Sequence, residues 1–171
     1  RDLPSAESLL TYEPVLPTYV RDVNGTPVQS FARERRVQLA YEEIPPQLIN
    51  AFLAAEDRTF FEHEGIGYPG MAGAVFDYVA KSDRGERARG GSTITQQVAK
   101  IFFTGDEYSV TRKIREAFLA RRIESVLEKD QILELYLNQI FLGRNAYGVQ
   151  AAARAYFDKD VAQLSLAESA Y

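Results

Sequence analysis

The chain has 171 residues, 46% of them hydrophobic, so it is long and apolar enough to form one domain with its own core. Its net charge of -4 gives no bulk electrostatic argument for binding nucleic acid or for strong attraction to anionic lipid. The absence of cysteine excludes disulfides, thiolate metal sites and a cysteine nucleophile.

Neither end of the sequence has a recognisable start or stop signal. No apolar run approaches the roughly 18 residues needed to span a bilayer, and the first residues have neither an initiating Met nor a signal-peptide pattern. The final LSLAESAY keeps a helical pattern with no Gly or Pro after it. We therefore expect an excerpt of a longer protein, truncated at its C-terminus.

Extended runs precede the helical part of the chain. The stretches TYVRDV and PVQSF flank Asn24-Gly25, which tolerates positive φ, and predict a small β-hairpin in an N-terminal segment, residues 1–43. From Ile44 the hydrophobic period becomes helical, and the two prolines that follow can start a helix. A mainly α domain is expected over residues 44–171, with a loop at SDRGERARGG and further helices at 69–82, 92–103, 110–128, 130–141, 147–157 and from 163 onward.

The segment EDRTFFEHEG contains the first candidate for chemistry. Glu56 continues the apolar stripe of the preceding helix by one turn, so we expect a partly desolvated carboxylate of the kind that serves as a general base. The alternative is a structural ion pair of Glu56 with Arg58 or Lys100. For His63 we favour a hydrogen-bonded core histidine over a functional one.

The segment GGSTITQQVAK predicts a helix N-terminus suited to a phosphate or a sugar. Thr93 and Gln96 match a capping box, and Gln96 shares a helix face with Lys100. Free N–H groups, hydroxyls, amides and a lysine one turn on favour an anionic ligand. Capping alone would explain the Gly, Ser and Thr, although not the two glutamines.

The segment RKIREAFLARRIE places a second acid on an apolar helix face. Helical indexing puts Glu116 beside Leu119 and Ile123, so it points inward. The nearby Arg112 and Lys113 would keep it ionised, which suits electrostatic or positioning work better than proton transfer. A structural ion pair is the alternative.

The remaining patterned segments favour scaffold roles. KDQILELYLNQIFLG has Asp130 as its expected helix cap and then repeats apolar residues at core spacing. GVQAAARAYF has the small residues of close helix packing. Two apolar clusters favour core packing, with membrane contact as the alternative: Met71, Val75, Phe76 and Val79, and Ile101, Phe102 and Phe103.

Taken in order, these five segments resemble the motifs of glycosyltransferase family 51, the peptidoglycan polymerase domain of class A penicillin-binding proteins and monofunctional transglycosylases. The motifs lie at 56–65, 90–100, 112–124, 129–143 and 148–157. The resemblance implies a bilobed, lysozyme-like helical fold, in which residues 69–105 belong to a smaller membrane-facing lobe.

The resemblance also implies roles for individual residues. Glu56 would be the general base, Glu116 the second catalytic acid, and Asp57 a residue that shapes the site. Contacts to the donor's pyrophosphate and sugars would come from Ser92, Thr95, Gln96, Gln97, Lys100, Arg112 and Lys113. Among these, the cations Lys100, Arg112 and Lys113 are the candidates for stabilising the leaving group, and Mg²⁺ or another divalent cation is the alternative.

The implied reaction polymerises lipid II into β-1,4 glycan with inversion and release of undecaprenyl pyrophosphate. The implied partners are lipid II, the growing glycan strand and a membrane surface, with a downstream transpeptidase domain in the full-length chain and no nucleic acid. The expected location is the periplasmic face of a bacterial inner membrane, with the anchor outside this chain.

The sequence departs from the family pattern at two glycines. Gly67 and Gly73 stand where the family usually has Asp and Arg, so we expect a looser segment over 67–80 and lower activity. Two other functions are considered. A lysozyme-like glycan hydrolase also needs a protonatable glutamate but no pyrophosphate site, and the two glycines give slight support to a non-catalytic cell-wall scaffold.

Overall fold

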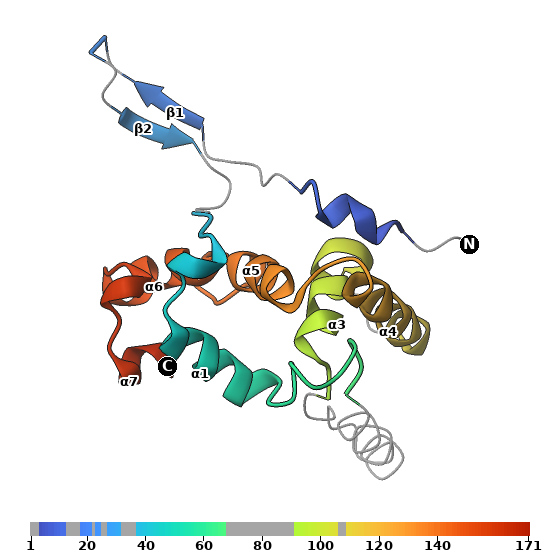
Figure 1. The fold of residues 1–171 in the computed structure, drawn as a ribbon. Coiled ribbons are helices and arrows are strands. Elements are labelled where there is room, and N and C mark those ends of the chain that lie inside the picture. The colour runs from blue at the N-terminus through green and yellow to red at the C-terminus, as the bar shows by residue number, and fades with distance from the viewer. Residues whose placement is uncertain are drawn as a thin grey trace.

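The computed structural model describes residues 4–12, 18–21, 23–24, 27–31, 37–67, 91–105 and 109–171. Over these residues the fold is mainly helical, as predicted (Figure 1). The helix expected at 69–82, the loop at SDRGERARGG except Gly91, the first apolar cluster and Gly73 lie outside them. None of the described helices has the length and hydropathy to span a bilayer.

Two short strands precede the helices. β1 (Thr18–Arg21) pairs antiparallel with β2 (Pro27–Phe31), Thr18 lying opposite Phe31, with a register irregularity between Val20 and Arg21. The pair stands apart from the helical body (Figure 1). The connection at Asn24-Gly25 includes residues outside the described ranges.

Helix α1 (Pro46–Glu56) begins with a proline at its first position, where the missing N–H costs no hydrogen bond. Leu48 and Ile49, near its start, are buried, and its last residue is Glu56. Asp57 follows as the C-cap residue, and its backbone N–H still bonds to Leu53 O at 3.0 Å. The start of α1 is therefore held by packing, whereas its end reaches the surface.

The described residues in the middle of the chain form α3, α4 and α5. α3 (Ile94–Ala99) continues into a π-helical turn, η3 (Lys100–Thr104). α4 (Val110–Glu124) is capped by Ser109, whose Oγ accepts from the Arg112 N–H at 3.0 Å, and α5 (Lys129–Gln139) follows. The expectation that Asp130 caps α5 is wrong. Glu128 is the cap residue, because its N–H bonds to the Gln131 side chain at 2.9 Å, which places Asp130 in the first turn.

The C-terminal part contains α6 (Val149–Phe157), a 3-10 turn (Val161–Gln163) and α7 (Leu166–Ser169). The helix predicted from 163 onward begins later, because the Ser165 Oγ accepts from the Glu168 N–H at 3.3 Å and sets the start at Leu166. The other predicted helices within the described residues agree with the structure to a few residues.

The core lies where α3, α4 and α5 meet. Most of its large, fully buried apolar side chains come from these three helices: Ile94, Val98, Leu119, Ile123, Ile132, Leu133, Tyr136 and Leu137. A 3-10 turn near the N-terminus, η1 (Ala6–Leu9), packs against α4 and buries Ala6 and Leu9 in the same core. Phe102 and Phe103 also pack against it, so core packing is the correct interpretation for these two, while Ile101 stays 38% exposed.

Candidate active site

Glu56 stands at the rim of an apolar cavity of about 560 Å³. Helices α1 and α6 supply most of its wall, including Phe52, Ala55, Val149, Ala153, Tyr156 and Phe157. The expectation of a partly desolvated Glu56 is wrong, because its side chain is exposed. The apolar stripe ends one turn earlier at Phe52, and no further turn of α1 follows to cover the carboxylate.

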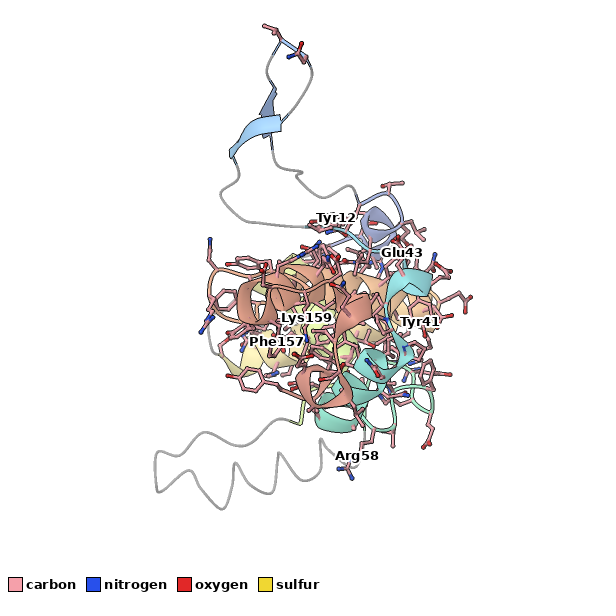
Figure 2. The ribbon with its side chains drawn as sticks, turned by 90° about the vertical axis from the view of Figure 1, so that its left-hand side faces the viewer. Tyr12, Tyr41, Glu43, Arg58, Phe157 and Lys159 are labelled. Atoms are coloured by element: carbon pink, nitrogen blue, oxygen red, sulfur yellow. The ribbon has the colours of Figure 1, made fainter. Side chains whose placement is uncertain are left out.

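The Glu56 carboxylate is held by helix α3. The amide nitrogen of Gln97 donates to Glu56 Oε2 at 2.9 Å, and the hydroxyl of Tyr136 donates to Gln97 Oε1 at 3.3 Å. Arg58, a candidate ion-pair partner of Glu56, instead donates to Ala54 O at 3.1 Å and projects away from the helical body (Figure 2). Glu56 therefore lies beside the helix that follows Ser92. The candidate base and the helix start predicted to bind an anion are close enough to form one site.

Asp57 ties the end of α1 to the start of α3. Its buried carboxylate accepts from the Ile94 N–H and from His63 Nε2, each at 3.0 Å. The Gly65 N–H donates to His63 Nδ1 at 3.1 Å, so in this network the ring proton lies on Nε2. The prediction of a hydrogen-bonded structural histidine is confirmed, and Asp57 is bound to the first backbone N–H of α3.

The start of α3 is a capping box, as predicted. The Gln96 N–H donates to Thr93 Oγ1 at 3.1 Å, and the Thr93 N–H donates to Gln96 Oε1 at 3.0 Å. The cap occupies the Gln96 side chain, which is buried, and the fully buried Thr95 donates to Glu124 Oε1 at 2.6 Å. This geometry argues against the expected substrate contacts of Thr95 and Gln96, because both side chains already serve internal hydrogen bonds.

The second acid, Glu116, is fully buried on α4, so its predicted inward orientation is confirmed. Arg112 pairs with its Oε1, and Lys113 Nζ lies 2.9 Å from its Oε2. The hydroxyl of Thr104 donates to Oε1 at 3.2 Å. Arg112 is buried, whereas the Lys113 side chain is 42% exposed and also donates to Ser92 Oγ at 2.6 Å. Two roles are compatible with these contacts. The group can be a structural ion pair inside the helical body, or it can hold the Lys113 ammonium in place for a ligand.

Helix α3 brings the predicted residues into two neighbouring groups. Its six residues span roughly 9 Å. Glu56 contacts it through Gln97, while Ser92, just before its start, contacts the Lys113 and Glu116 group. Lys100 is partly exposed at the first position of η3. An exposed acid and a partly exposed cation therefore lie close to one short helix.

Sequence reasoning missed a polar cluster beneath the site. Lys129 Nζ donates to Glu124 Oε1 and to His63 O, each at 2.7 Å, and lies 4.4 Å from the centre of the Phe60 ring. Thr95 donates to the same glutamate oxygen. In the sequence, these residues are marked only by their positions within four of the five motifs. The cluster holds the loop after α1 against the starts of α3 and α5.

The described residues contain no group of three or more His, Cys, Asp or Glu side chains that could hold a metal ion.

Of the two glycines that depart from the family pattern, only Gly67 lies among the described residues. A Cβ at Gly67 would meet Thr93 Cγ2 at 3.4 Å, which is ordinary contact, so the backbone here leaves room for a side chain. The looseness expected over 67–80 stays a prediction.

Residues 24–171 match the transglycosylase family. The chain is 46% identical to penicillin-binding protein 1A of Rickettsia felis over 171 residues, which are all of this chain and 22% of that protein. It is 46% identical to penicillin-binding protein 1A of Neisseria lactamica over 168 residues, 98% of this chain and 21% of that protein. The identity to penicillin-binding protein 1A of Escherichia coli K12 is 43% over 168 residues, 98% of this chain and 19% of that protein.

The chain therefore belongs to the transglycosylase family. The prediction of a peptidoglycan glycosyltransferase domain of the class A penicillin-binding protein type is confirmed at the level of the family. The chain spans about a fifth of the length of the curated relatives that it matches.

Proposed function

We propose that this domain polymerises lipid II into β-1,4-linked glycan with inversion and with release of undecaprenyl pyrophosphate. Glu56 takes the proton of the acceptor's 4-hydroxyl, whose oxygen attacks the anomeric carbon of the growing chain. The bond from that carbon to the pyrophosphate oxygen breaks, and the pyrophosphate leaves with the bonding electrons. The observation that supports this assignment best is the exposed Glu56 carboxylate, held by Gln97 at the rim of the cavity.

An exposed base suits this reaction because both substrates are large. A lipid-linked disaccharide could not reach a carboxylate enclosed in the core, whereas it can approach the end of α1. Binding of the substrates would then exclude water from Glu56 and strengthen its interaction with the hydroxyl proton. The desolvation expected from the sequence would thus come with the substrate.

The group around Lys113 suits the leaving pyrophosphate. Glu116 is enclosed, and its charge balances Arg112 and orients Lys113 from below. The Lys113 ammonium stays partly exposed beside Ser92, where it can meet a developing negative charge. Lys100 lies one helix turn beyond Gln96 and is proposed to add a second cation. A diphosphate can also carry Mg²⁺ or another divalent cation with it, since Mg²⁺ often binds through substrate phosphates.

The proposal also covers the two lobes of the domain, its location in the cell and a second domain that follows it. We infer a bilobed lysozyme-like fold with the N-terminal hairpin, in which residues 69–105 form a membrane-facing lobe. The domain would act at the periplasmic face of the inner membrane, beside its lipid-linked substrate, with a transpeptidase domain downstream. Support comes from the greater length of the penicillin-binding protein 1A relatives and from the penicillin binding after which they are named.

Incubation of the complete protein with labelled lipid II tests the proposal. Wild type, Glu56→Gln and Glu116→Gln are compared with Mg²⁺ and with a chelator, and products are separated by length. Polymer from the wild type and almost none from either variant is expected. Cutting of preformed glycan without polymer would favour the hydrolase, and glycan binding without any reaction would favour the scaffold.

A further inference from the structure

Two successive hydrogen bonds lead from the core to the Glu56 carboxylate. Tyr136, on α5, is 1% exposed, and its hydroxyl donates to Gln97 Oε1 at 3.3 Å. The amide nitrogen of the same glutamine donates to Glu56 Oε2 at 2.9 Å. One line of side chains therefore joins α5, α3 and the end of α1.

The two ends of the Gln97 amide are not equivalent. Its oxygen only accepts and its nitrogen only donates, and an ionised carboxylate only accepts. The nitrogen must therefore face Glu56 for a bond to form, and the hydroxyl of Tyr136 satisfies the oxygen at the other end. Without that hydroxyl the amide loses its fixed end, and a turned amide would place two acceptors against each other.

Tyr136 is well placed to act as a fixed donor. Burial, followed by the negative charge of Glu56, raises the pKa of Tyr136 far above its ordinary value, so its hydroxyl keeps its proton at neutral pH. Its ring packs edge-on against Phe52, with ring centres 6.0 Å apart and planes at 85°. Phe52 precedes Glu56 by one turn of α1. The tyrosine therefore contacts α1 through its ring and α3 through its hydroxyl.

We propose that Tyr136 and Gln97 are positioning residues for Glu56: the tyrosine hydroxyl sets the orientation of the glutamine amide, and the amide nitrogen aims the carboxylate. The inference rests on the proposed function, because it takes Glu56 as the base. It gives Gln97 a role toward the base that the sequence did not predict, and it assigns a role to a tyrosine that the sequence placed only in the scaffold.

The test measures kcat and KM for lipid II polymerisation by the complete protein. Tyr136→Phe keeps the ring, and Gln97→Met keeps the approximate size while removing both amide groups. Each is expected to lower kcat by roughly ten- to a hundredfold with KM changed by less than about twofold, since misplacement of a catalytic group costs rate rather than binding. The double variant is expected to be no slower than the slower single variant, because both act through one carboxylate.

Tyr41→Phe is the control. The Tyr41 side chain lies beside Asp130, at the start of the helix that also carries Tyr136, and Tyr41 is not one of the residues that line the cavity next to Glu56. It should keep the wild-type kcat. An equal loss in Tyr41→Phe would overturn the positioning role, as would multiplying losses in the double variant or a raised KM at unchanged kcat.

Glu56→Gln separates this inference from the function on which it rests. If Glu56→Gln is inactive while Tyr136→Phe keeps the wild-type rate, the positioning role is wrong and the base assignment stands. If Glu56→Gln still polymerises lipid II, the base assignment fails and the positioning role fails with it. If circular dichroism shows that Tyr136→Phe is unfolded, Gln97→Met and Gln97→Glu test the positioning role instead. Both variants must then have a low kcat, because the first removes the amide and the second places a negative charge beside Glu56.

Discussion

The Lys113 ammonium group donates to the Ser92 hydroxyl at 2.6 Å and so joins α4 to the residues that precede α3. The same ammonium lies 2.9 Å from Glu116. Lys113 is therefore held from two sides while remaining partly exposed, which is the arrangement expected of a preorganised cation.

Replacing this lysine tests its role toward the leaving group. Lys113→Met is expected to lower kcat/KM for lipid II by about a hundredfold, because the developing charge on the pyrophosphate loses a fixed cation. Arg122→Met, which also removes one cation from α4 but breaks only an exposed contact to Glu7, is the control and should change the rate little. Equal losses in the two variants would mean that overall positive charge matters and not the position of Lys113.

Asp57 is predicted to matter for stability through its two hydrogen bonds. Asp57→Asn keeps the shape but turns an amide N–H₂ toward one of two donors, His63 or the Ile94 N–H. We expect a loss of about 1–3 kcal/mol in the free energy of unfolding, measured by urea denaturation. Asp158→Asn is the control, since this exposed helix-end residue has φ 53°, a conformation that asparagine adopts readily. A loss below about 0.5 kcal/mol for Asp57→Asn would contradict the tie between α1 and α3.

Gly65 is expected to tolerate no side chain. Its φ is +84°, and a Cβ would lie 2.8 Å from the backbone carbonyl of Ala120 on α4. Gly65→Ala should therefore cost at least about 2 kcal/mol, because a steric clash adds to the cost of positive φ. Gly105→Ala separates the two effects: its φ is +66°, but no heavy atom of the described residues lies within 4 Å, so a loss of only about 1 kcal/mol is expected. Equal losses in thermal or chemical unfolding would rule out the contact with α4.

Glu168 gives a prediction for acid pH. The hydrogen bond from Lys159, with those from the backbone and side chain of Ser165, lowers the pKa of Glu168 from 4.5 to about 2. A depressed native pKa stabilises the fold in full above 4.5, and this stabilisation is lost as the pH falls toward 2. Glu168→Gln should therefore be less stable than wild type at pH 7, and the two should converge as the pH falls from 4.5 to about 2, as measured by urea midpoints. A difference that stays constant down to pH 2 would show that the Lys159 pair does not titrate as described.

The sequence predicted best what depends on neighbours along the chain. Helical period located α4 and α5 and the inward orientation of Glu116, and the spacing of Thr93 and Gln96 located the start of α3. These features are determined within one or two helix turns, so they can be read locally.

What the sequence missed depends on partners far along the chain. The Tyr136 ring is core, as its period indicates, but its hydroxyl partner Gln97 is 39 residues away. Glu56 is exposed because α1 ends there, although its position continues an apolar stripe. A periodic pattern shows which face a residue occupies and not whether another helix covers that face.

The burial of Ala6 and Leu9 has a practical consequence for anyone shortening this protein. The family match begins at residue 24, yet these two side chains, 0% and 6% exposed, fill part of the interior against α4. A version cut at the family boundary would open a hole in the helical body and expose part of the core beside α4 to water. The helical body thus includes residues that lie before the start of the family match.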